Sequence, residues 1–82
     1  MRNKVLQKSI LNILNRVDDV FLRETTLAAE AEIAVDRPLT TGEFADELRY
    51  LEDRELIEKD HTLLDDRMWH ITAKGQLALK GL

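Results

Sequence analysis

Apolar residues recur at helical spacing near the N-terminus. They lie three or four positions apart, so on a helix they would form one stripe. The stripe consists of Leu6, Ile10, Ile13, Leu14 and Val17. Leu11 falls off the stripe, and Asp18 and Asp19 end it. The pattern predicts a first helix with apolar surface in a second direction, facing either another neighbour in the fold or a dimer partner.

A short strand and a second helix are expected next. Val20–Leu22 is a run of strand-forming residues that is too brief to stand alone. Thr25 and Thr26 are suitable N-cap residues for a helix whose Ala-rich body is Leu27–Ala34. Pro38 disfavours helical geometry at the residue before it, so the second helix should end before this proline.

The next segment carries a helix-start signal followed by an apolar face. Thr40 and Glu43 have the spacing of a capping box, in which each side chain bonds to the other residue's backbone N–H. Phe44, Leu48 and Leu51 follow at i, i+4 and i+7. A third helix is therefore predicted, with these three residues facing the core.

Two strands are predicted after the third helix. Leu56–Asp60 leaves the helix as a strand, and Arg67–Ile71 reads as its antiparallel partner. The connection, His61–Asp66, is long enough to be a loop rather than a tight turn. Alternation along the second strand places Trp69 and Ile71 on the same face, where Trp69 is expected to anchor the hairpin in the core.

A last short helix completes the chain. Thr72 can cap it, its body is Ala73–Leu79, and it is expected to bury Leu77 and Leu79. The order is then helix, short strand, helix, helix, strand, loop, strand, helix. This order predicts a single α+β domain over residues 1–82, with a three-helix core, a small three-stranded antiparallel sheet and a short C-terminal helix.

Two stretches in this order resemble known proteins. LRYLEDRELIEKD (Leu48–Asp60) and WHITAKGQLAL (Trp69–Leu79) are similar to motifs of winged helix-turn-helix regulators. The chain most resembles the small winged-helix proteins of Mu-type prophages and, more distantly, MarR- and PadR-type regulators. The resemblance implies a winged helix-turn-helix fold and a DNA-binding transcriptional regulator of bacterial or prophage origin. The chain departs from the pattern at Glu55, where these families tend to have the Gly that ends helix 3.

Composition qualifies this implication. The 82 residues are 44% hydrophobic and 34% charged, as in one ordinary globular domain. There is no Cys for disulfides or thiolate metal sites, and no run approaches the roughly 20 apolar residues of a membrane span. The N-terminus MRNKVLQKS lacks the apolar run of a secretory signal, so the cytoplasm is the expected location. A net charge of −4 and a pI of about 5.1 count against DNA, because duplex-binding domains often have a pI above ~9.

The resemblance implies that the outward face of the third helix reads DNA. Its candidate DNA-binding residues are Thr41, Gly42, Arg49 and Tyr50. Arg49 is the expected base reader because a guanidinium can donate two hydrogen bonds to guanine, and Tyr50 would reach a phosphate or a thymine methyl. In the alternative, Asp46 and Asp53 lie at i−3 and i+4 from Arg49, hold it in surface ion pairs and repel phosphates.

The hairpin loop corresponds to the wing of the resembled fold. Its candidate phosphate-binding residues are Lys59, His61 and Arg67, with His61 adding little at neutral pH. Leu63 and Leu64 lie at the loop tip and either fold back onto the core or contact a partner. For a homodimer, Val5 and Leu11 of the first helix and the C-terminal helix are the candidate surfaces.

The sequence carries no recognisable catalytic constellation. His61 with Asp60, Asp65 and Asp66 lacks the ligand spacing of a metal site. No Ser-His-Asp set or Gly-rich phosphate loop is present. The chain is therefore expected to be no enzyme and to need no cofactor or metal. A rival to double-stranded DNA binding keeps the fold but makes it a protein–protein interaction module, whose acidic third helix meets a basic partner.

Overall fold

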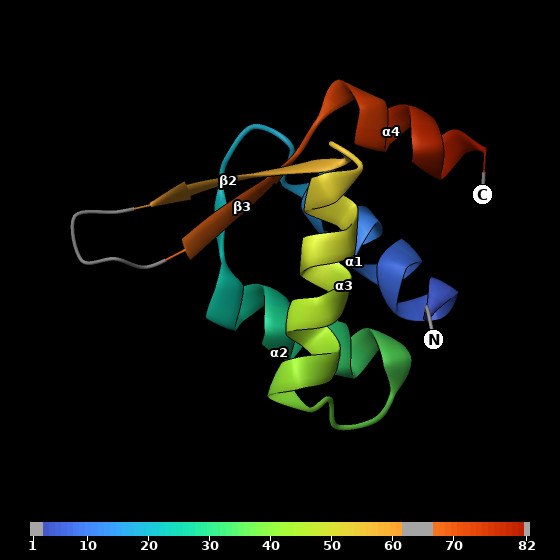
Figure 1. The fold of residues 1–82 in the computed structure, drawn as a ribbon, viewed down its shortest axis with the longest axis vertical. Coiled ribbons are helices and arrows are strands. Elements are labelled where there is room, and N and C mark those ends of the chain that lie inside the picture. Colours follow the sequence, from blue (N-terminus) through green and yellow to red (C-terminus); the bar gives the residue numbers. More distant parts are fainter. Residues whose placement is uncertain (1–2, 62–66, 82) are drawn as a thin grey trace.

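The computed structural model describes residues 3–61 and 67–81 and contains the predicted types of element in the predicted order. Figure 1 shows the helices gathered on one side and a strand hairpin projecting from them. The elements are α1 (Lys4–Arg16), β1 (Leu22–Arg23), α2 (Glu24–Val35), α3 (Thr41–Asp53), β2 (Ile57–His61), β3 (Arg67–Ile71) and α4 (Ala73–Lys80). The predicted α+β architecture is confirmed.

The sheet has three antiparallel strands in the order β1-β3-β2. The hairpin register pairs Ile57 with Ile71 and Lys59 with Trp69, and β1 adds the pair of Leu22 with Trp69 on the other edge of β3. Trp69 and Ile71 are buried while their neighbours in β3 are partly or fully exposed. The predicted alternation is confirmed, and it fixes which side of the hairpin meets the helices.

Helix α1 lies at the centre of the fold and contacts α2, α3, α4 and β3. Four stripe residues are buried, namely Leu6, Ile10, Ile13 and Leu14. Leu11 is only 1% exposed within the single chain, so the prediction that it forms a dimer contact is wrong. It faces a second neighbour inside the fold because α1 is surrounded by other elements.

Helix α2 begins earlier than predicted. It starts at Glu24, directly after β1, and its N-cap Arg23 makes no side-chain capping bond. Thr25 and Thr26 therefore lie inside the first turn and are exposed, so their predicted capping role is wrong. The cause is the pairing of Leu22 and Arg23 with β3, which carries the strand right up to the helix start.

Helix α3 begins with one of the two predicted capping-box bonds, since the Glu43 carboxylate bonds Arg37 instead of the Thr40 N–H. The Thr40 hydroxyl accepts a hydrogen bond from the Glu43 N–H at 3.0 Å. At the other end, Glu55 adopts a left-handed φ of 64°, and the Leu56 N–H reaches the Leu51 carbonyl at 3.0 Å. This is the 6→1 bond of a Schellman ending. Glu55 thus adopts the left-handed conformation that favours Gly, and α3 ends there although this chain has Glu at the position.

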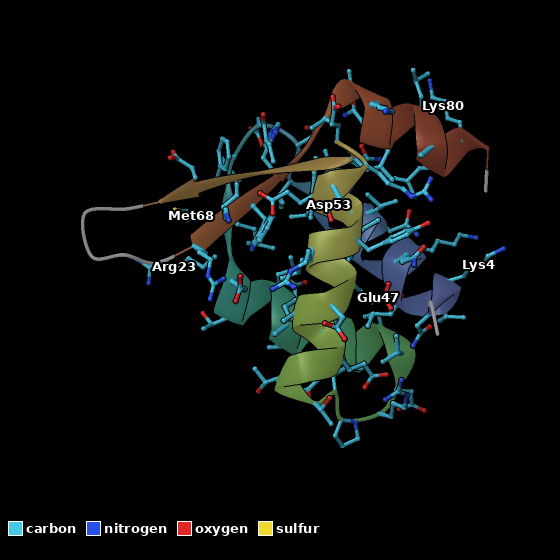
Figure 2. The ribbon with its side chains drawn as sticks, viewed as in Figure 1. Lys4, Arg23, Glu47, Asp53, Met68 and Lys80 are labelled. Carbon is cyan, nitrogen blue, oxygen red and sulfur yellow. The ribbon has the colours of Figure 1, made fainter. Side chains whose placement is uncertain are left out.

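A buried carboxylate joins α1 to α3. Glu47 is 3% exposed and lies on the side of α3 that faces α1 (Figure 2). Its carboxylate accepts hydrogen bonds from the Asn3 backbone N–H at 3.2 Å and from the Gln7 amide at 2.8 Å. A buried carboxylate needs such donors to offset its lost hydration. Glu47 therefore fixes the start of α1 against the middle of α3.

The last helix follows the hairpin without a linker. The Thr72 hydroxyl caps α4 by accepting from the Gly75 N–H at 3.0 Å, as predicted. Leu79 packs against the core, whereas Leu77 is 67% exposed, so the predicted burial of Leu77 is wrong. Gly75 is the buried residue of α4, and it lies against the Leu56 carbonyl and the Ile71 side chain. This contact turns the Leu77 side of the helix away from the core.

Candidate nucleic-acid interface

Arg49 projects from the exposed side of α3 and is free of partners within residues 3–61 and 67–81. It makes no hydrogen bond or ion pair with any of these residues, Asp46 and Asp53 included. The predicted alternative, in which these two carboxylates hold Arg49 in ion pairs, is therefore wrong for the described chain. The guanidinium keeps all its donors available for an external acceptor.

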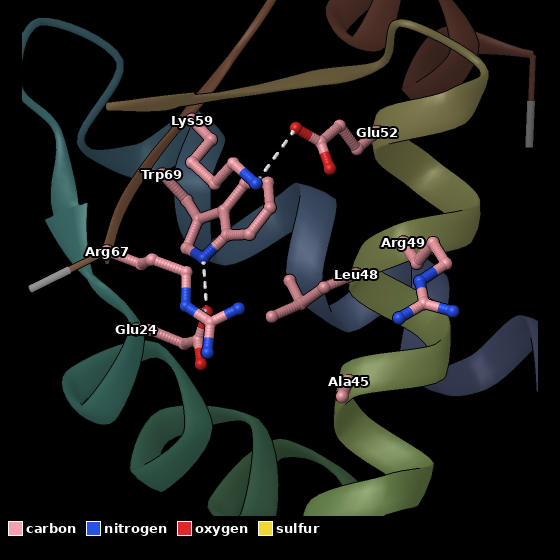
Figure 3. Close-up of a pocket in the computed structure, with 8 residues that line it drawn as sticks. All are labelled: Glu24, Ala45, Leu48, Arg49, Glu52, Lys59, Arg67 and Trp69. Carbon is pink, nitrogen blue, oxygen red and sulfur yellow. Dashed lines mark hydrogen bonds and ion pairs between the residues drawn. The ribbon is translucent and has the colours of Figure 1, made fainter. Parts of the chain in front are cut away.

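Arg49 lines a cavity of about 120 Å³ between α3 and the hairpin. Figure 3 shows the side chains that line it from α2, α3, β2 and β3. They are Glu24, Ala45, Leu48, Arg49, Glu52, Lys59, Arg67 and Trp69. Three residues predicted separately as DNA contacts, Arg49, Lys59 and Arg67, thus border one hollow. The fold brings them together because β2 follows the turn at Glu55 and contacts α3, and β3 pairs with β2.

Lys59 is held by a carboxylate of α3. Its ammonium lies 3.7 Å from the Glu52 carboxylate and 5.8 Å from the centre of the Trp69 ring. Both separations allow a favourable electrostatic contact, with the carboxylate and with the face of the indole. The stem of Lys59 is thereby kept beside the hollow with its charge near the surface, since its side chain is 31% exposed.

Arg67 is held by a carboxylate of α2. Its Nε lies 3.6 Å from Glu24 Oε1, and the same oxygen accepts a 2.9 Å hydrogen bond from the Trp69 indole N–H. A buried indole N–H needs an acceptor. Glu24 therefore serves Trp69 and Arg67 together, across the seam between α2 and β3.

The remaining residues predicted to contact DNA differ in how exposed they are and in how far the structure describes them. Thr41 and Gly42 are exposed in the first turn of α3. Tyr50 is half-buried against the core and carries the Arg54 guanidinium 4.7 Å above its ring, so it does not project fully outward as expected. Of His61 only the backbone is described, paired with Arg67, and Leu63 and Leu64 fall outside the described residues.

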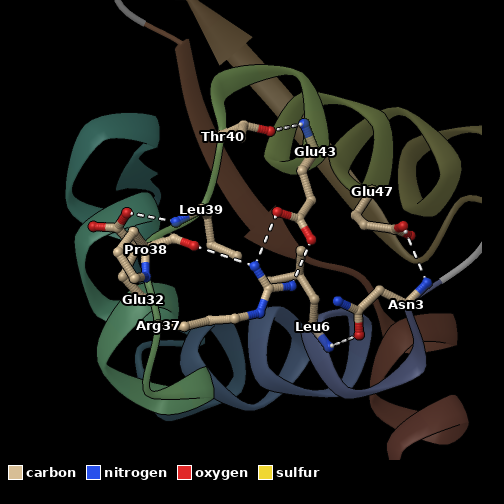
Figure 4. A network of polar contacts seen from close by, with 9 residues as sticks. All are labelled: Asn3, Leu6, Glu32, Arg37, Pro38, Leu39, Thr40, Glu43 and Glu47. Atoms are coloured by element: carbon tan, nitrogen blue, oxygen red, sulfur yellow. Dashed lines mark hydrogen bonds and ion pairs between the residues drawn. The ribbon is translucent and has the colours of Figure 1, made fainter.

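A tighter ion pair lies beside the start of α3. Arg37 donates to both carboxylate oxygens of Glu43, at 2.5 and 3.1 Å (Figure 4). The hydrogen bonds from Arg37 hold the pKa of Glu43 below its usual value, against an opposing effect of burial. Glu43 in turn raises the pKa of Arg37. This bidentate pair occupies Arg37, which therefore does not add a free cation to the α3 face.

Sequence reasoning missed the contacts of Glu24 at this site and of Glu47 between α1 and α3. Their partners are distant in sequence: Glu47 accepts a hydrogen bond from Gln7, 40 positions away, and Glu24 accepts one from Trp69, 45 positions away. Only one signal was present in the sequence: a core Trp predicts that some acceptor lies near its N–H. Within the described residues no group of three or more His, Asp or Glu is arranged to hold a metal ion. None of the described helices is long and apolar enough to cross a membrane.

Comparison with solved structures places this geometry in a known fold. RosR of H. salinarum superimposes with a TM-score of 0.80 at 21% identity, over 93% of this chain and 66% of that one. F93 from STIV, a winged-helix DNA-binding protein, gives a TM-score of 0.80 at 17% identity, over 99% and 86% of the two chains. The fold is a winged helix-turn-helix.

A further structural match differs more in length. A mutant of MepR from S. aureus gives a TM-score of 0.69 at 20% identity, over 99% of this chain and 54% of that one. No protein-family model matches the sequence, and no curated protein matches it significantly. The chain spans just under two thirds of the RosR chain. At these identities the likeness establishes the fold, and function has to be argued from the site.

Proposed function

We propose that this chain is a DNA-binding transcriptional regulator in which α3 enters the major groove and the β2–β3 wing contacts the backbone. One observation carries the proposal. Arg49 is free among the described residues and stands at the same hollow as Lys59 and Arg67. A free guanidinium on the helix beside two wing cations is the arrangement that a base contact and flanking phosphate contacts require.

The start of α3 supports the same orientation. A side chain at Gly42 would meet no atom within 4 Å, so the space beside its Cα is open. The first N–H groups of a helix carry partial positive charge and favour a nearby phosphate. Thr41 supplies a hydroxyl at the same place. His61 belongs to the wing end of the same proposed footprint.

Asp46 and Asp53 favour a second candidate function. Both are exposed on α3 and neither forms an ion pair within the described chain. Two unneutralised carboxylates would repel phosphates and suit a basic protein surface. The second candidate is therefore a protein–protein interaction module with the same fold, which uses this acidic α3 face and does not bind DNA.

The proposal also covers the oligomeric state, the cellular location and the origin of the protein. A homodimer would use Val5, which is 66% exposed on α1, together with the exposed Leu77 of α4. The protein would act in the cytoplasm as a regulator without enzymatic activity, and a bacterial or prophage origin, Mu-type in particular, remains a prediction from the resemblance.

A pair of double variants tests the DNA-binding proposal and its site together. We expect Arg49→Gln with Lys59→Gln to weaken binding to a labelled duplex at least tenfold, because one bidentate base contact is worth about 1–3 kcal/mol. Arg16→Gln with Lys80→Gln is the matched control, since it removes the same charge from α1 and α4. Equal affinities of the two double variants would contradict the assigned site. The measurement is fluorescence anisotropy at fixed salt.

A further inference from the structure

We infer that Glu24 and Glu52 act as built-in competitors of DNA phosphate, each occupying one wing cation until the duplex displaces it. The inference rests on the proposed function and adds two residues that set its affinity. Glu52 of α3 faces Lys59 of β2, and Glu24 of α2 faces Arg67 of β3 (Figure 3). Both carboxylates therefore reach across from the helices to the wing.

The geometry of these two pairs suits exchange. Their N···O separations are 3.7 and 3.6 Å, longer than a charge-assisted hydrogen bond. Lys59 and Arg67 are 31% and 57% exposed, so an external phosphate can approach them without unfolding the site. Exposed pairs of this kind are weakly held. The cations are oriented by their carboxylates but not locked by them.

The Arg37–Glu43 pair shows the contrast within the same molecule. Arg37 donates two hydrogen bonds to Glu43, the shorter at 2.5 Å, and a third to the Pro38 carbonyl. An arginine fixed in this way has little capacity to turn toward a phosphate. The pairs on the two cations that border the hollow with Arg49 are looser, as is the Arg16–Glu30 pair outside the hollow.

Glu24 and Glu52 also explain how two acidic residues beside the cations would lower the affinity for DNA. A phosphate can take Lys59 only when the contact between Lys59 and Glu52 is broken, which lowers the affinity for DNA. Breaking an exposed ion pair of this kind corresponds to about threefold in affinity. The freed Glu52 carboxylate also retains a salt cation that DNA binding would otherwise release. The affinity therefore depends less steeply on salt. The carboxylates hence keep binding weak while leaving the cations correctly placed.

Removing one charge at a time tests this competition. Glu52→Gln keeps the shape and hydrogen-bonding capacity of the side chain but removes its charge. We expect it to bind a labelled random-sequence duplex about threefold more tightly than the unmodified chain, because no ion pair with Lys59 has to be broken, and to show a log–log salt slope steeper by up to about 0.9. In a Lys59→Gln background the gain should vanish, because the carboxylate acts through that lysine.

The control is Glu30→Gln, which changes net charge equally. Glu30 pairs with Arg16 at 3.7 Å, and neither residue lines the hollow. Glu24→Gln provides an independent second variant at Arg67, and far-UV circular dichroism verifies that each variant is folded. A Glu52→Gln gain no larger than that of Glu30→Gln, or one that persists without Lys59, overturns the inference alone. If the unmodified chain binds no duplex even at low salt, the proposed function falls with it.

Discussion

Glu43 takes part in two contacts at the start of α3, one through its backbone and one through its side chain. Its backbone N–H is the donor to the Thr40 cap, while its carboxylate receives Arg37. The capping-box spacing predicted the Thr40 bond correctly. It did not predict Arg37, which reaches Glu43 because the chain turns back between α2 and α3 (Figure 4).

The Glu43 pair predicts a specific response to acid. Because the folded chain holds the pKa of Glu43 below its ordinary value, its stabilisation is complete above the unfolded carboxyl pKa of ~4.3 and is lost as pH falls through the lower folded value. We expect Glu43→Gln to lose less stability than the unmodified chain between about pH 6 and about pH 3. Urea unfolding across that range measures the difference. Parallel pH profiles would show that the pair contributes no pH-dependent stability.

Arg49 illustrates the limit of reasoning from spacing. Positions i−3 and i+4 made ion pairs with Asp46 and Asp53 geometrically reasonable, yet the described chain forms neither. Surface pairs of this kind are weak and compete with the side chain's own freedom. Sequence spacing identifies which residues are able to meet, whereas the fold decides which do.

Among the elements, α4 depends on a close approach that only glycine permits. A Cβ at Gly75 would lie 2.1 Å from the Leu56 carbonyl oxygen and 2.8 Å from an Ile71 side-chain carbon. The backbone carbonyl cannot yield as a flexible side chain would. The helix is therefore docked on the turn that follows α3, and its cap residue Thr72 also donates to the Glu55 carbonyl at 2.7 Å.

Two glycine substitutions should have opposite effects on stability. Gly75→Ala is expected to destabilise the fold by about 1–3 kcal/mol, the usual cost of overpacking. Gly42→Ala, in an open position of α3, should stabilise it by up to about 1 kcal/mol because alanine is the better helix former. Thermal or urea unfolding compares them directly. A neutral Gly75→Ala would show that α4 is not held by this contact.

For the molecule as a whole, the order of the elements and much of the core could be predicted from the sequence. Periodicity located α1, α3 and the hairpin because their apolar residues face one shared core: Phe44, Leu48, Leu51, Trp69 and Ile71 are all buried as predicted. Leu11 and Leu77 were misplaced. Their burial depends on how many neighbours surround α1 and on which side of α4 Gly75 docks, and neither is a property of local spacing.

Part of the candidate site could likewise be predicted from the sequence, and part required the structure. Arg49, Lys59 and Arg67 could be proposed from the resemblance, since each occupies a defined position on the third helix or the wing. Their meeting at one hollow, and the placing of Glu24 and Glu52 opposite the wing cations, required the tertiary structure. Charge balance across a fold depends on partners that are distant in sequence, so net charge alone does not give the arrangement of these groups.

The central claim is that an acidic chain binds duplex DNA through a local group of cations. Its most direct test is the affinity for a labelled random duplex between about 50 and about 200 mM salt. If Lys59 and Arg67 each neutralise one phosphate, log affinity should fall linearly with log salt, at a slope that reaches at most about −2 because Glu24 and Glu52 flatten it. Absence of binding at the lowest salt, or an affinity independent of salt, would contradict the claim and favour the protein–protein role.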